Sequence, residues 1–481
     1  MSKNKNKIEI NIIGTASEDV TGSCVWVKTP NVQILIECGL YQVCGKNAIL
    51  KQYTVNNEHF PFHPKDIDYI FVCHTHQDHL GRVPKVYQMG AQCPLIMPAG
   101  SKKVAQLLME DSAHILESDA RYLSKKFNRD YSPVYTIDDV DTSLYHLYEY
   151  PIGQEVQLDE FVKFKFISSG HILNSAQLEL YITNGNLVKK ILYTSDLGNV
   201  LIKKPYVREI DYPERVNVVI GESTYGAELH EANEKIRMKD LEKIRASVEK
   251  IQASGSGRIM IPVFANSRCQ EMLTYLYGLF GEDSTFKIPV LVDSPLALSI
   301  CSAYDDLLEG EDKDLWKQVR QWKNVVWLQN PDDSRAWRAD KRPLIVLCSS
   351  GMITQGRSVM WAAELLPNPD NIILFCGFSA KGSLGDQIKH CKNNKGTIYF
   401  PTINKVLHKN CQIVNLTSFS SHMQRQSLRK YYGSLDFEKL ILVHGSEQSK
   451  LSIAPEIEEE LYKNDKSSKV VCATKDYSIK I

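Results

Sequence analysis

The sequence predicts an α/β protein in which one domain is interrupted by a second one. Short strands dominate the first 225 residues, strands and helices alternate between residues 226 and 395, and short strands return in residues 396–481. Regular alternation of strands and helices is typical of a parallel α/β domain. A chain of 481 residues is also too long for one ordinary hydrophobic core.

The individual elements follow from hydrophobic periodicity and from the turn residues between apolar runs. In the first part we expect a helix at 107–126 and strands at 8–13, 23–28, 32–37, 67–73, 160–168, 188–193 and 216–220. In the middle we expect strands at 258–264, 289–292, 344–348 and 371–376, and helices at 231–253, 267–280, 296–308, 358–366 and 384–392. We therefore expect residues 1–225 and 396–481 to form one domain, and residues 226–395 to form the inserted domain.

The composition excludes several classes of protein. Basic and acidic residues number 57 each, so an anionic polymer would have to be held by a local basic strip or by bound metals. The polar start, residues 1–7, and the lack of any run of about 18 apolar residues predict neither a signal peptide nor a contact with a membrane. Twelve cysteines without a C-x-x-C pair predict reduced thiols in a cytoplasmic protein.

The densest chemical signal is a run of three histidines and one aspartate, His74, His76, Asp78 and His79. It follows directly after the expected strand at 67–73. Extended spacing would send His74, His76 and Asp78 the same way, with His79 coming from the turn. Imidazole and carboxylate are the usual zinc ligands, and a catalytic zinc keeps a position for water. The run therefore predicts a catalytic metal site, against the alternative of a polar loop with unrelated histidines.

This H-x-H-x-D-H run resembles the signature of the metallo-β-lactamase superfamily, and the following L-G-R-V-P resembles its nucleic-acid-processing branch, the β-CASP family. His171 in S-S-G-H-I-L-N-S-A and Asp196 in Y-T-S-D-L-G match later motifs of that family. The resemblance implies a metallo-β-lactamase αββα sandwich interrupted by a parallel α/β β-CASP domain. It also implies two zinc ions, with Asp196 shared between one bound by His74, His76 and His171 and another bound by Asp78, His79 and a later histidine.

The resemblance extends over nearly the whole chain. Glu222 in G-E-S-T-Y-G and His230 fit the entry of the β-CASP insertion, and S-F-S-S-H and V-H-G near the end place His422 and His444 in two further motifs. Stretches at 258–271, 292–297, 349–352 and 382–385 also match. In this family a histidine at the position of His444 completes the second zinc site and is associated with RNA substrates rather than DNA.

The implied activity is that of a zinc-dependent ribonuclease in which two metals activate a water for phosphodiester hydrolysis. His422 is the expected general acid, Glu222 the residue that orients it, and Asp78 belongs to the catalytic group as well as to the ligands. We expect single-stranded RNA to lie in a cleft between the two domains. Since no appended RNA-binding domain is evident before residue 8 or after residue 481, we expect an endonuclease, and a homodimer is a further expectation.

Substrate contacts are predicted at a glycine-rich helix start. Free backbone N–H groups of Gly382, Ser383 and Gly385 would favour an anionic phosphate. Arg268 and Lys381 are the expected phosphate neighbours. The alternatives are an ordinary loop for the glycines and a solvated surface side chain for Lys381.

Three positions depart from the family pattern: Glu37 and Gln424 replace aspartate, and Lys381 stands where bacterial relatives often have glutamate. Two other functions stay open. One is a different enzyme, either a DNA nuclease or a metallohydrolase of a smaller ester. The other is a non-catalytic RNA-binding scaffold that has retained the fold.

Overall fold

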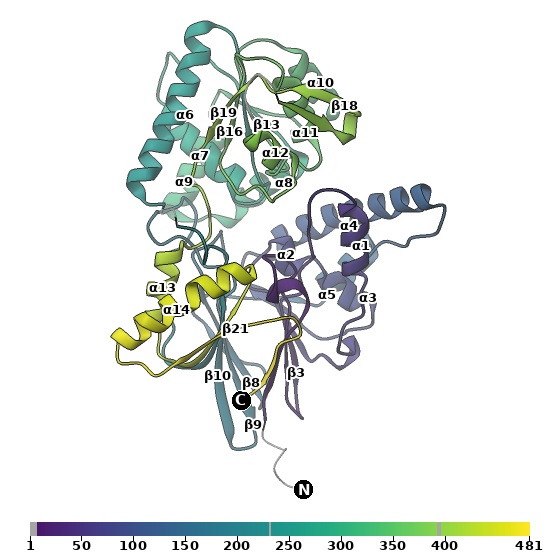
Figure 1. Ribbon diagram of the computed structural model, residues 1–481, viewed down its shortest axis with the longest axis vertical. Coiled ribbons are helices and arrows are strands. Elements are labelled where there is room, and N and C mark those ends of the chain that lie inside the picture. Colours follow the sequence, from purple (N-terminus) through teal and green to yellow (C-terminus); the bar gives the residue numbers. More distant parts are fainter. Residues whose placement is uncertain (1–6, 230–231, 392–395) are drawn as a thin grey trace.

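The computed structural model describes residues 7–229, 232–391 and 396–481, which form two lobes (Figure 1). The lobe that we call the sandwich lobe contains two seven-stranded sheets, and the inserted lobe contains one six-stranded sheet. The chain enters the inserted lobe after Glu222 and returns from it before residue 425. The C-terminal strand pairs with the first strand of the chain, so the sandwich lobe is built from both ends of the described sequence.

The two sheets of the sandwich lobe pack face to face around an apolar core. The first sheet has the order β22-β1-β2-β3-β4-β5-β6, with the bounds Ser478–Lys480, Glu9–Ile12, Val25–Lys28, Gln33–Ile36, Tyr69–Phe71, Leu95–Pro98 and Leu147–Tyr150. The second has the order β21-β20-β11-β10-β9-β8-β7, with the bounds Lys469–Cys472, Phe437–Val443, Val216–Glu222, Leu187–Tyr193, Ala176–Asn184, Val162–Ser168 and Glu155–Gln157. Between them, Phe71 lies edge-on to Phe164 with ring centroids 5.0 Å apart.

Helices cover both outer faces of this sandwich. The first sheet is covered by α2 (Gln77–Leu80), α3 (Val83–Gln88), α4 (Lys102–Phe127) and α5 (Ile137–Tyr145), and α1 (Ala48–Asn56) packs beside α4. The second sheet is covered by α13 (Arg425–Ser434) and α14 (Glu447–Lys463). The order of layers is therefore helix, sheet, sheet, helix, as expected. None of the described helices is long and apolar enough to cross a membrane.

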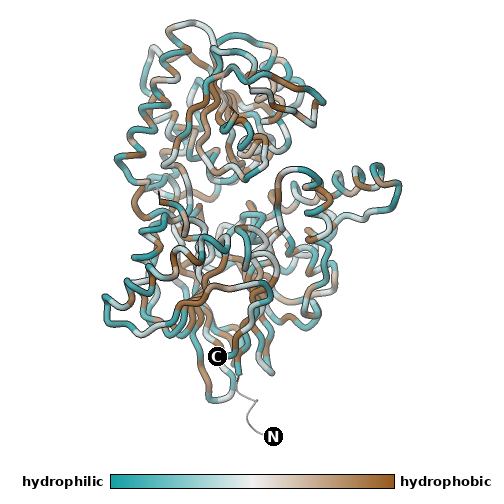
Figure 2. The backbone as a smooth tube through the Cα atoms, in the orientation of Figure 1, coloured by the Kyte–Doolittle hydropathy of each residue, from teal (hydrophilic) through white to brown (hydrophobic). Residues whose placement is uncertain are grey.

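The inserted lobe is a parallel sheet with helices on both faces. Its strand order is β14-β13-β15-β12-β16-β19, with the bounds Val325–Trp327, Val290–Asp293, Ile345–Cys348, Ile259–Pro262, Ile372–Phe375 and Gln412–Asn415. One face packs against α6 (Glu234–Ser254), α7 (Arg268–Phe280), α8 (Pro295–Leu307) and α9 (Gly310–Arg320). The other packs against α11 (Arg357–Leu365) and α12 (Leu384–His390), with α10 (Pro331–Ala339) beside them. Strands buried on both faces explain the continuous apolar runs of this region, which are brown in Figure 2.

The expected fold class is confirmed, whereas the expected end of the inserted domain is too early. The predicted boundary at 395/396 adjoins residues 392–395, which lie outside the described residues. Beyond it, β17 (Thr397–Phe400) and β18 (Lys405–His408) form a hairpin on the inserted lobe, and β19 joins its sheet. We therefore propose that the insertion continues to about residue 416. Short strands alone cannot reveal this, because they occur in both lobes.

Candidate metal centre

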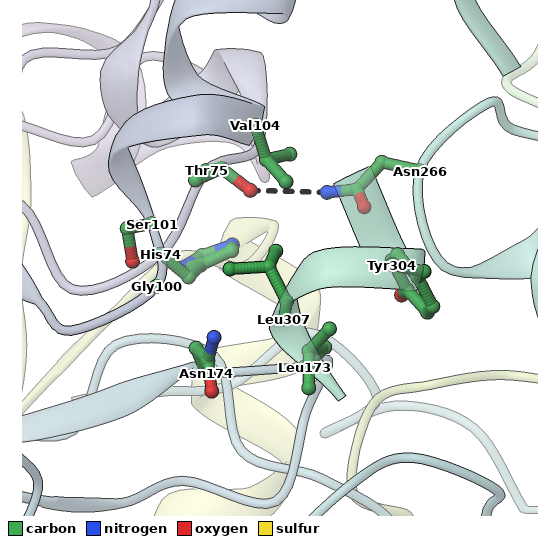
Figure 3. A pocket seen from close by; sticks show the side chains of 10 residues that line it. All are labelled: His74, Thr75, Gly100, Ser101, Val104, Leu173, Asn174, Asn266, Tyr304 and Leu307. Carbon is green, nitrogen blue, oxygen red and sulfur yellow. Dashed lines mark hydrogen bonds between the residues drawn. The ribbon is translucent and has the colours of Figure 1, made fainter. Parts of the chain in front are cut away.

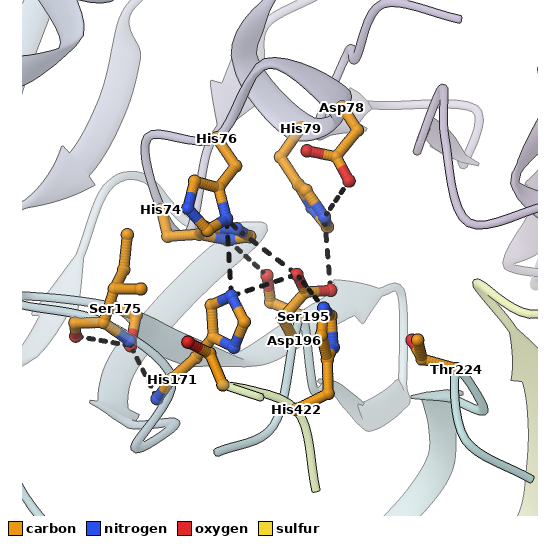
Figure 4. A network of polar contacts seen from close by, with 12 residues as sticks. His74, His76, Asp78, His79, His171, Ser175, Ser195, Asp196, Thr224 and His422 are labelled. Carbon is orange, nitrogen blue, oxygen red and sulfur yellow. Dashed lines mark hydrogen bonds and ion pairs between the residues drawn. The ribbon is translucent and has the colours of Figure 1, made fainter. Parts of the chain in front are cut away.

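The candidate site lies at one rim of the sandwich lobe, where loops follow the ends of strands. The loops after β4, β8, β10 and β20 carry the run from His74 to His79, His171, Asp196 and His444, respectively. β10, β11 and β20 are parallel neighbours, so their carboxyl ends meet at this rim. The structure thus brings together all seven residues that were predicted to bind metal (most are drawn in Figure 4). His230 lies outside the described residues.

The turn after β4 divides the first motif between two groups of ligands. His76 is the N-cap residue of α2 and is extended, with φ −66° and ψ 150°. Asp78 and His79 are already helical, and the Asp78 carboxylate lies apart from His74 and His76 (Figure 4). This corrects the expectation that Asp78 points the same way as those two histidines. Gly39 permits the turn, because an ideal Cβ there would lie 1.7 Å from the carbonyl oxygen of Asp78.

The first ligand group consists of His74, His76, His171 and one oxygen of Asp196. His76 Nδ1 lies 3.2 Å from His74 Nε2 and 3.3 Å from His171 Nε2. Asp196 Oδ2 lies 3.5 Å from His74 Nε2 and 3.4 Å from His171 Nε2. A tetrahedron of ligands at zinc distances of about 2.0–2.1 Å has edges of about 3.3 Å. These four atoms are therefore spaced like the ligands of one such ion.

The second ligand group consists of Asp78, His79, His444 and the other oxygen of Asp196. Asp196 Oδ1 lies 3.2 Å from His79 Nε2 and 3.4 Å from His444 Nδ1. Asp78 Oδ2 lies 3.7 Å from His79 Nε2 and 3.5 Å from His444 Nε2. Each oxygen of Asp196 thus faces a different group, as a carboxylate shared between two metal positions would.

Several buried polar atoms of these groups have no hydrogen-bond partner within the described ranges. They are both ring nitrogens of His79, both carboxylate oxygens of Asp196, Nδ1 of His171 and Nε2 of His444. Their contacts with neighbouring ligand atoms, such as 3.2 Å between His79 and Asp196, lack hydrogen-bond geometry. Burying polar atoms without partners is costly. Of these atoms, His79 Nε2, His444 Nε2 and the two oxygens of Asp196 face other ligand atoms. Imidazole nitrogens and carboxylate oxygens with free lone pairs fit metal ions well.

The electrostatics of the two groups differ. Burial lowers the pKa of His74, His76 and His171 below that of a free imidazole, which favours the neutral form that binds metals. Burial acts in the same direction on His79, but the charges of Asp196, Asp78 and Glu37 outweigh it and raise its pKa. The carboxylates around His79 thus make this part of the site strongly negative, and bound metal ions would balance that charge.

Glu37, one of the departures from the family pattern, supports the ligands from behind. Its Oε1 accepts hydrogen bonds from the backbone N–H of Cys73 and the hydroxyl of Ser195, both at 3.2 Å, and lies 3.5 Å from His79 Nδ1. Ser195 Oγ in turn lies 3.0 Å from His74 Nδ1. Glu37, Ser195 and His444 all have left-handed backbone conformations, with φ 61°, 50° and 48°. Such non-glycine residues are strained and tend to gather at functional sites. Ser195 was not predicted, although it immediately precedes Asp196.

His422 lies at the mouth of the site with Glu222 behind it. Its Nδ1 is 3.3 Å from Glu222 Oε1, and its Nε2 is 3.9 Å from Asp196 Oδ2. The same oxygen of Glu222 accepts a hydrogen bond of 2.6 Å from the N–H of Leu197, and Oε2 accepts one from Thr224. Burial alone would lower the pKa of His422, but the charges of Glu222 and Asp196 raise it to about 9. An imidazole with this environment holds a proton at neutral pH.

Lys204 is a buried residue of the site that the sequence did not reveal. Its ammonium group donates to three backbone carbonyls, those of Gly170 and His171 at 3.1 Å and that of Ser421 at 2.9 Å. It therefore ties the loop of His171 to the loop of His422. Burial lowers the pKa of Lys204 to about 7. The local sequence Lys203-Lys204-Pro205 contains no motif that would predict such a contact.

Arg268 is not placed where we expected a phosphate neighbour. Its side chain is buried, it forms an ion pair with Glu271, and it donates to the hydroxyl of Ser421 at 2.9 Å. It supports the loop before His422 from the inserted lobe instead of facing solvent. The loop that precedes Arg268 also reaches the sandwich lobe: Asn266 donates a hydrogen bond of 3.0 Å to the hydroxyl of Thr75. Figure 3 shows this contact beside the small interdomain pocket that adjoins His74.

The amides that we expected to hold a phosphate are already engaged. The N–H of Gly382 donates to Asp386 Oδ2 at 2.9 Å, and the N–H of Gly385 donates to the carbonyl of Met352 at 3.0 Å. Ser383 donates its own N–H to Ala380 and caps α12 through its hydroxyl. These residues therefore form a closed helix start, which corrects the predicted phosphate cradle. Lys381 itself is exposed.

Two family models match the chain. One, described as a Beta-Casp domain, matches residues 269–388. The other, described as a Zn-dependent metallo-hydrolase RNA specificity domain, matches residues 406–467, which contain both His422 and His444. The first match lies within the inserted lobe, and the second begins there and ends in the sandwich lobe.

Curated relatives match over most of the chain. The transcription termination factor FttA of Methanocaldococcus jannaschii is 28% identical over 93% of this chain and 68% of its own length. Ribonuclease TTHA0252 of Thermus thermophilus is 26% identical over 91% of this chain and 93% of its own length. An RNase J-like protein of M. jannaschii is also 26% identical, over 90% of this chain and 91% of its own length.

A solved structure shares the fold over the full length. It is the crystal structure of a protein of unknown function from Enterococcus faecalis V583, with a TM-score of 0.51 and 10% sequence identity. The likeness covers 99% of this chain and 100% of the other. At this identity it bears on the fold alone.

Proposed function

The chain belongs to the β-CASP family of the metallo-β-lactamase superfamily, and on that premise we propose that it is a two-zinc ribonuclease that hydrolyses single-stranded RNA. The observation that carries this proposal is Asp196, whose two oxygens face two separate ligand groups. A carboxylate shared between two such groups would hold two metal ions close together, an arrangement that suits two-metal hydrolysis of a phosphodiester. The spacing of the ligand atoms and their nitrogen and oxygen chemistry favour zinc.

Two metal ions held there would supply a nucleophile at neutral pH and stabilise negative charge on the phosphate. The side chains of the chain supply the rest of the chemistry. His422 is positioned to give a proton to the leaving oxygen from Nε2, which faces the ligand groups, while Glu222 fixes the ring through Nδ1. Asp78 contributes a ligand oxygen next to His444 and keeps about a fifth of its side chain exposed.

RNA is supported as the substrate by two findings. The family model over residues 406–467 is described as an RNA specificity domain, and two of the relatives above are named as ribonucleases or ribonuclease-like. A DNA nuclease remains the second candidate only through the shared fold. Labelled RNA and DNA of one sequence, incubated side by side with and without a chelator, separate the two. Cleavage of DNA but not RNA would contradict the proposal.

Metal content tests the scaffold alternative. We expect close to two zinc ions per chain by elemental analysis of protein purified without chelators. All seven ligand side chains are present and gathered, so a chain that carries no metal and cleaves nothing would instead favour an RNA-binding scaffold.

We further propose that cleavage is endonucleolytic, which circular RNA tests because it offers no ends. Linear products from a circular substrate would support endonucleolytic attack. A circle that persists while linear RNA of the same sequence is degraded would show an exonuclease.

A further inference from the structure

Two aromatic side chains of the inserted lobe are exposed in loops that meet the sandwich lobe. Phe264 follows β12 and Phe378 follows β16, the strand next to it. The Phe264 side chain is 39% exposed and that of Phe378 is 56% exposed. Large aromatic rings ordinarily bury most of their surface, and exposed ones near a functional site often contact a ligand or a partner.

The placement of these rings is fixed by contacts on either side of them. Asn266, two residues after Phe264, donates to Thr75, which lies between His74 and His76. Two residues span at most about 7 Å, so the backbone of Phe264 lies within that distance of the residue that joins the inserted lobe to the histidine loop. Gly382, four residues after Phe378, comes within 3.7–3.9 Å of Cys44 and Gly45 of the sandwich lobe, measured from its ideal Cβ position.

Phe264 is flanked by glycines rather than by side chains that would cover it. An ideal Cβ at Gly351 would lie 3.2 Å from Phe264 Cδ2, and one at Gly377 would lie 3.8 Å from Cε2. Neither glycine has a positive φ, so the backbone conformation does not demand glycine there. At Gly377 a side chain would fit in ordinary contact with the ring, and its absence leaves the ring open.

Positive charge accompanies the rings. Lys381 lies in the loop of Phe378, and Lys46 lies beside Gly45 in the facing loop of the sandwich lobe. Both side chains are exposed, and within the described part of the chain neither forms an ion pair with a carboxylate. Because the chain as a whole has a net charge of zero, an anionic strand would be attracted by local positive charge such as that of Lys46 and Lys381.

We propose that Phe264 and Phe378 are stacking positions for nucleobases of a single strand, and that Lys46 and Lys381 neutralise its backbone phosphates. Aromatic rings beside a positively charged groove are the usual means of holding single-stranded nucleic acid without reading its sequence. Bases in a duplex are stacked on one another and cannot reach such rings. This subsite rests on the proposed ribonuclease function and explains why the substrate would be single-stranded.

The first test compares substrates with and without bases. For Phe264→Ala and Phe378→Ala we expect KM for oligouridylate RNA to rise by about tenfold each, with kcat little changed. Cleavage of a fully abasic ribose-phosphate oligomer, which has no aromatic ring to stack, should stay at the wild-type rate. Phe127→Ala is the matched control, because Phe127 is 43% exposed at the end of α4 in the sandwich lobe. Wild-type KM in both variants would overturn the proposal.

A second measurement separates stacking from other effects. Wild-type enzyme should lose affinity for an RNA with one abasic residue at the stacked position, while Phe264→Ala should lose nothing further. Such non-additivity is the signature of two groups in contact. Full additivity of the two losses at every position of the abasic residue would contradict stacking on Phe264.

Binding can also be followed without catalysis. In Phe378→Trp, oligouridylate should quench the fluorescence of the new indole beyond any change in wild type, and a duplex of the same length should not. This result would hold even if the chain cleaved no RNA, so the subsite and the proposed activity can fail separately. Absence of quenching at saturating oligonucleotide would remove the subsite. Lys46→Ala and Lys381→Ala should each reduce the salt dependence of binding by about one charge.

Discussion

The loops of the metal centre and the loop from Lys381 to Gly385 were both predicted to bind ligands, yet only the first keeps its polar groups free. In the metal centre, buried nitrogen and oxygen atoms of His79 and Asp196 have no hydrogen-bond partner in the described regions. In the second loop, the N–H groups of Gly382 and Gly385 donate to Asp386 and to the carbonyl of Met352.

The difference comes from the kind of atom that carries the signal. The ability of an imidazole or carboxylate side chain to bind a metal can be predicted from the residue type, wherever the fold places it. Backbone amides are common to all residues, and a neighbouring carboxylate can satisfy them as easily as a phosphate can. A glycine-rich helix start therefore predicts a ligand only when its amides remain free, and α12, which has seven residues, closes its own start.

Removing Asp196 should have the largest effect, because it belongs to both ligand groups. For Asp196→Ala we expect loss of both zinc ions and a decrease in activity well beyond the roughly 10–100-fold that follows loss of an outer partner of a ligand. Elemental analysis and RNA cleavage measure the two losses together. An active variant without metal would contradict the two-metal arrangement.

Asp293→Asn is the matched control for this variant. Asp293 is also fully buried, but it lies in the inserted lobe and bonds to Ser334 and Trp361. The substitution should lower the stability of that lobe and leave the zinc content at two. Treatment of the wild type with a chelator should lower its melting temperature, because ions that bind only the folded state stabilise it.

His422→Ala should separate proton transfer from metal binding. We expect kcat to fall by about 10²–10⁴-fold, the usual contribution of a general acid, while the zinc content stays unchanged. The ligand atoms of both groups remain in place in this variant, since His422 stands 3.9 Å from Asp196 at the mouth. Loss of zinc would show instead that His422 is a ligand. A substrate with a leaving group that needs no proton, such as 4-nitrophenolate, should recover most of the rate.

Lys204→Met should reduce kcat to an intermediate extent, because it changes only the position of the loop that carries His422. The lysine ties the carbonyls of His171 and Ser421, and its loss should let the loop of His422 shift relative to the ligands. Displacements of about 1 Å can cost on the order of 100-fold, so we expect kcat to fall by about 10–100-fold with KM and zinc content retained. Lys204→Arg should restore part of the rate.

Lys409→Met supplies the comparison for Lys204. Lys409 is equally buried and donates to the carbonyl of Cys391 at 2.6 Å, but it lies in the inserted lobe away from the ligands. It should affect stability without changing kcat. Equal losses of kcat in the two variants would assign Lys204 to general stability rather than to positioning.

The sequence predicted side-chain chemistry better than it predicted geometry. The seven predicted ligands could be picked out because their residue types and order are distinctive, and the structure gathers all of them at one rim. The helical turn that separates Asp78 from His76 was missed, since alternating polar residues look extended until the turn is placed. Lys204 was missed because only the fold brings it to backbone carbonyls of residues distant in the chain. Helix α9 was also missed, because its charged residues hide the buried Trp316 and Val319.

The smallest effect is expected at Ser383, and it distinguishes a helix cap from a substrate contact most directly. Ser383→Ala removes the hydroxyl that accepts the N–H of Asp386, which should destabilise the start of α12 by about 1 kcal/mol. Faster hydrogen exchange of the first amides of α12 would measure this loss, and KM for RNA should stay at the wild-type value. Lys381→Ala, two residues away, should do the opposite: it should weaken RNA binding in a salt-dependent way and leave exchange in α12 unchanged, since its side chain is exposed. If Ser383→Ala raised KM as much as Lys381→Ala, the amides of this loop would have to open toward the substrate, and the closed helix start would describe only the state without RNA.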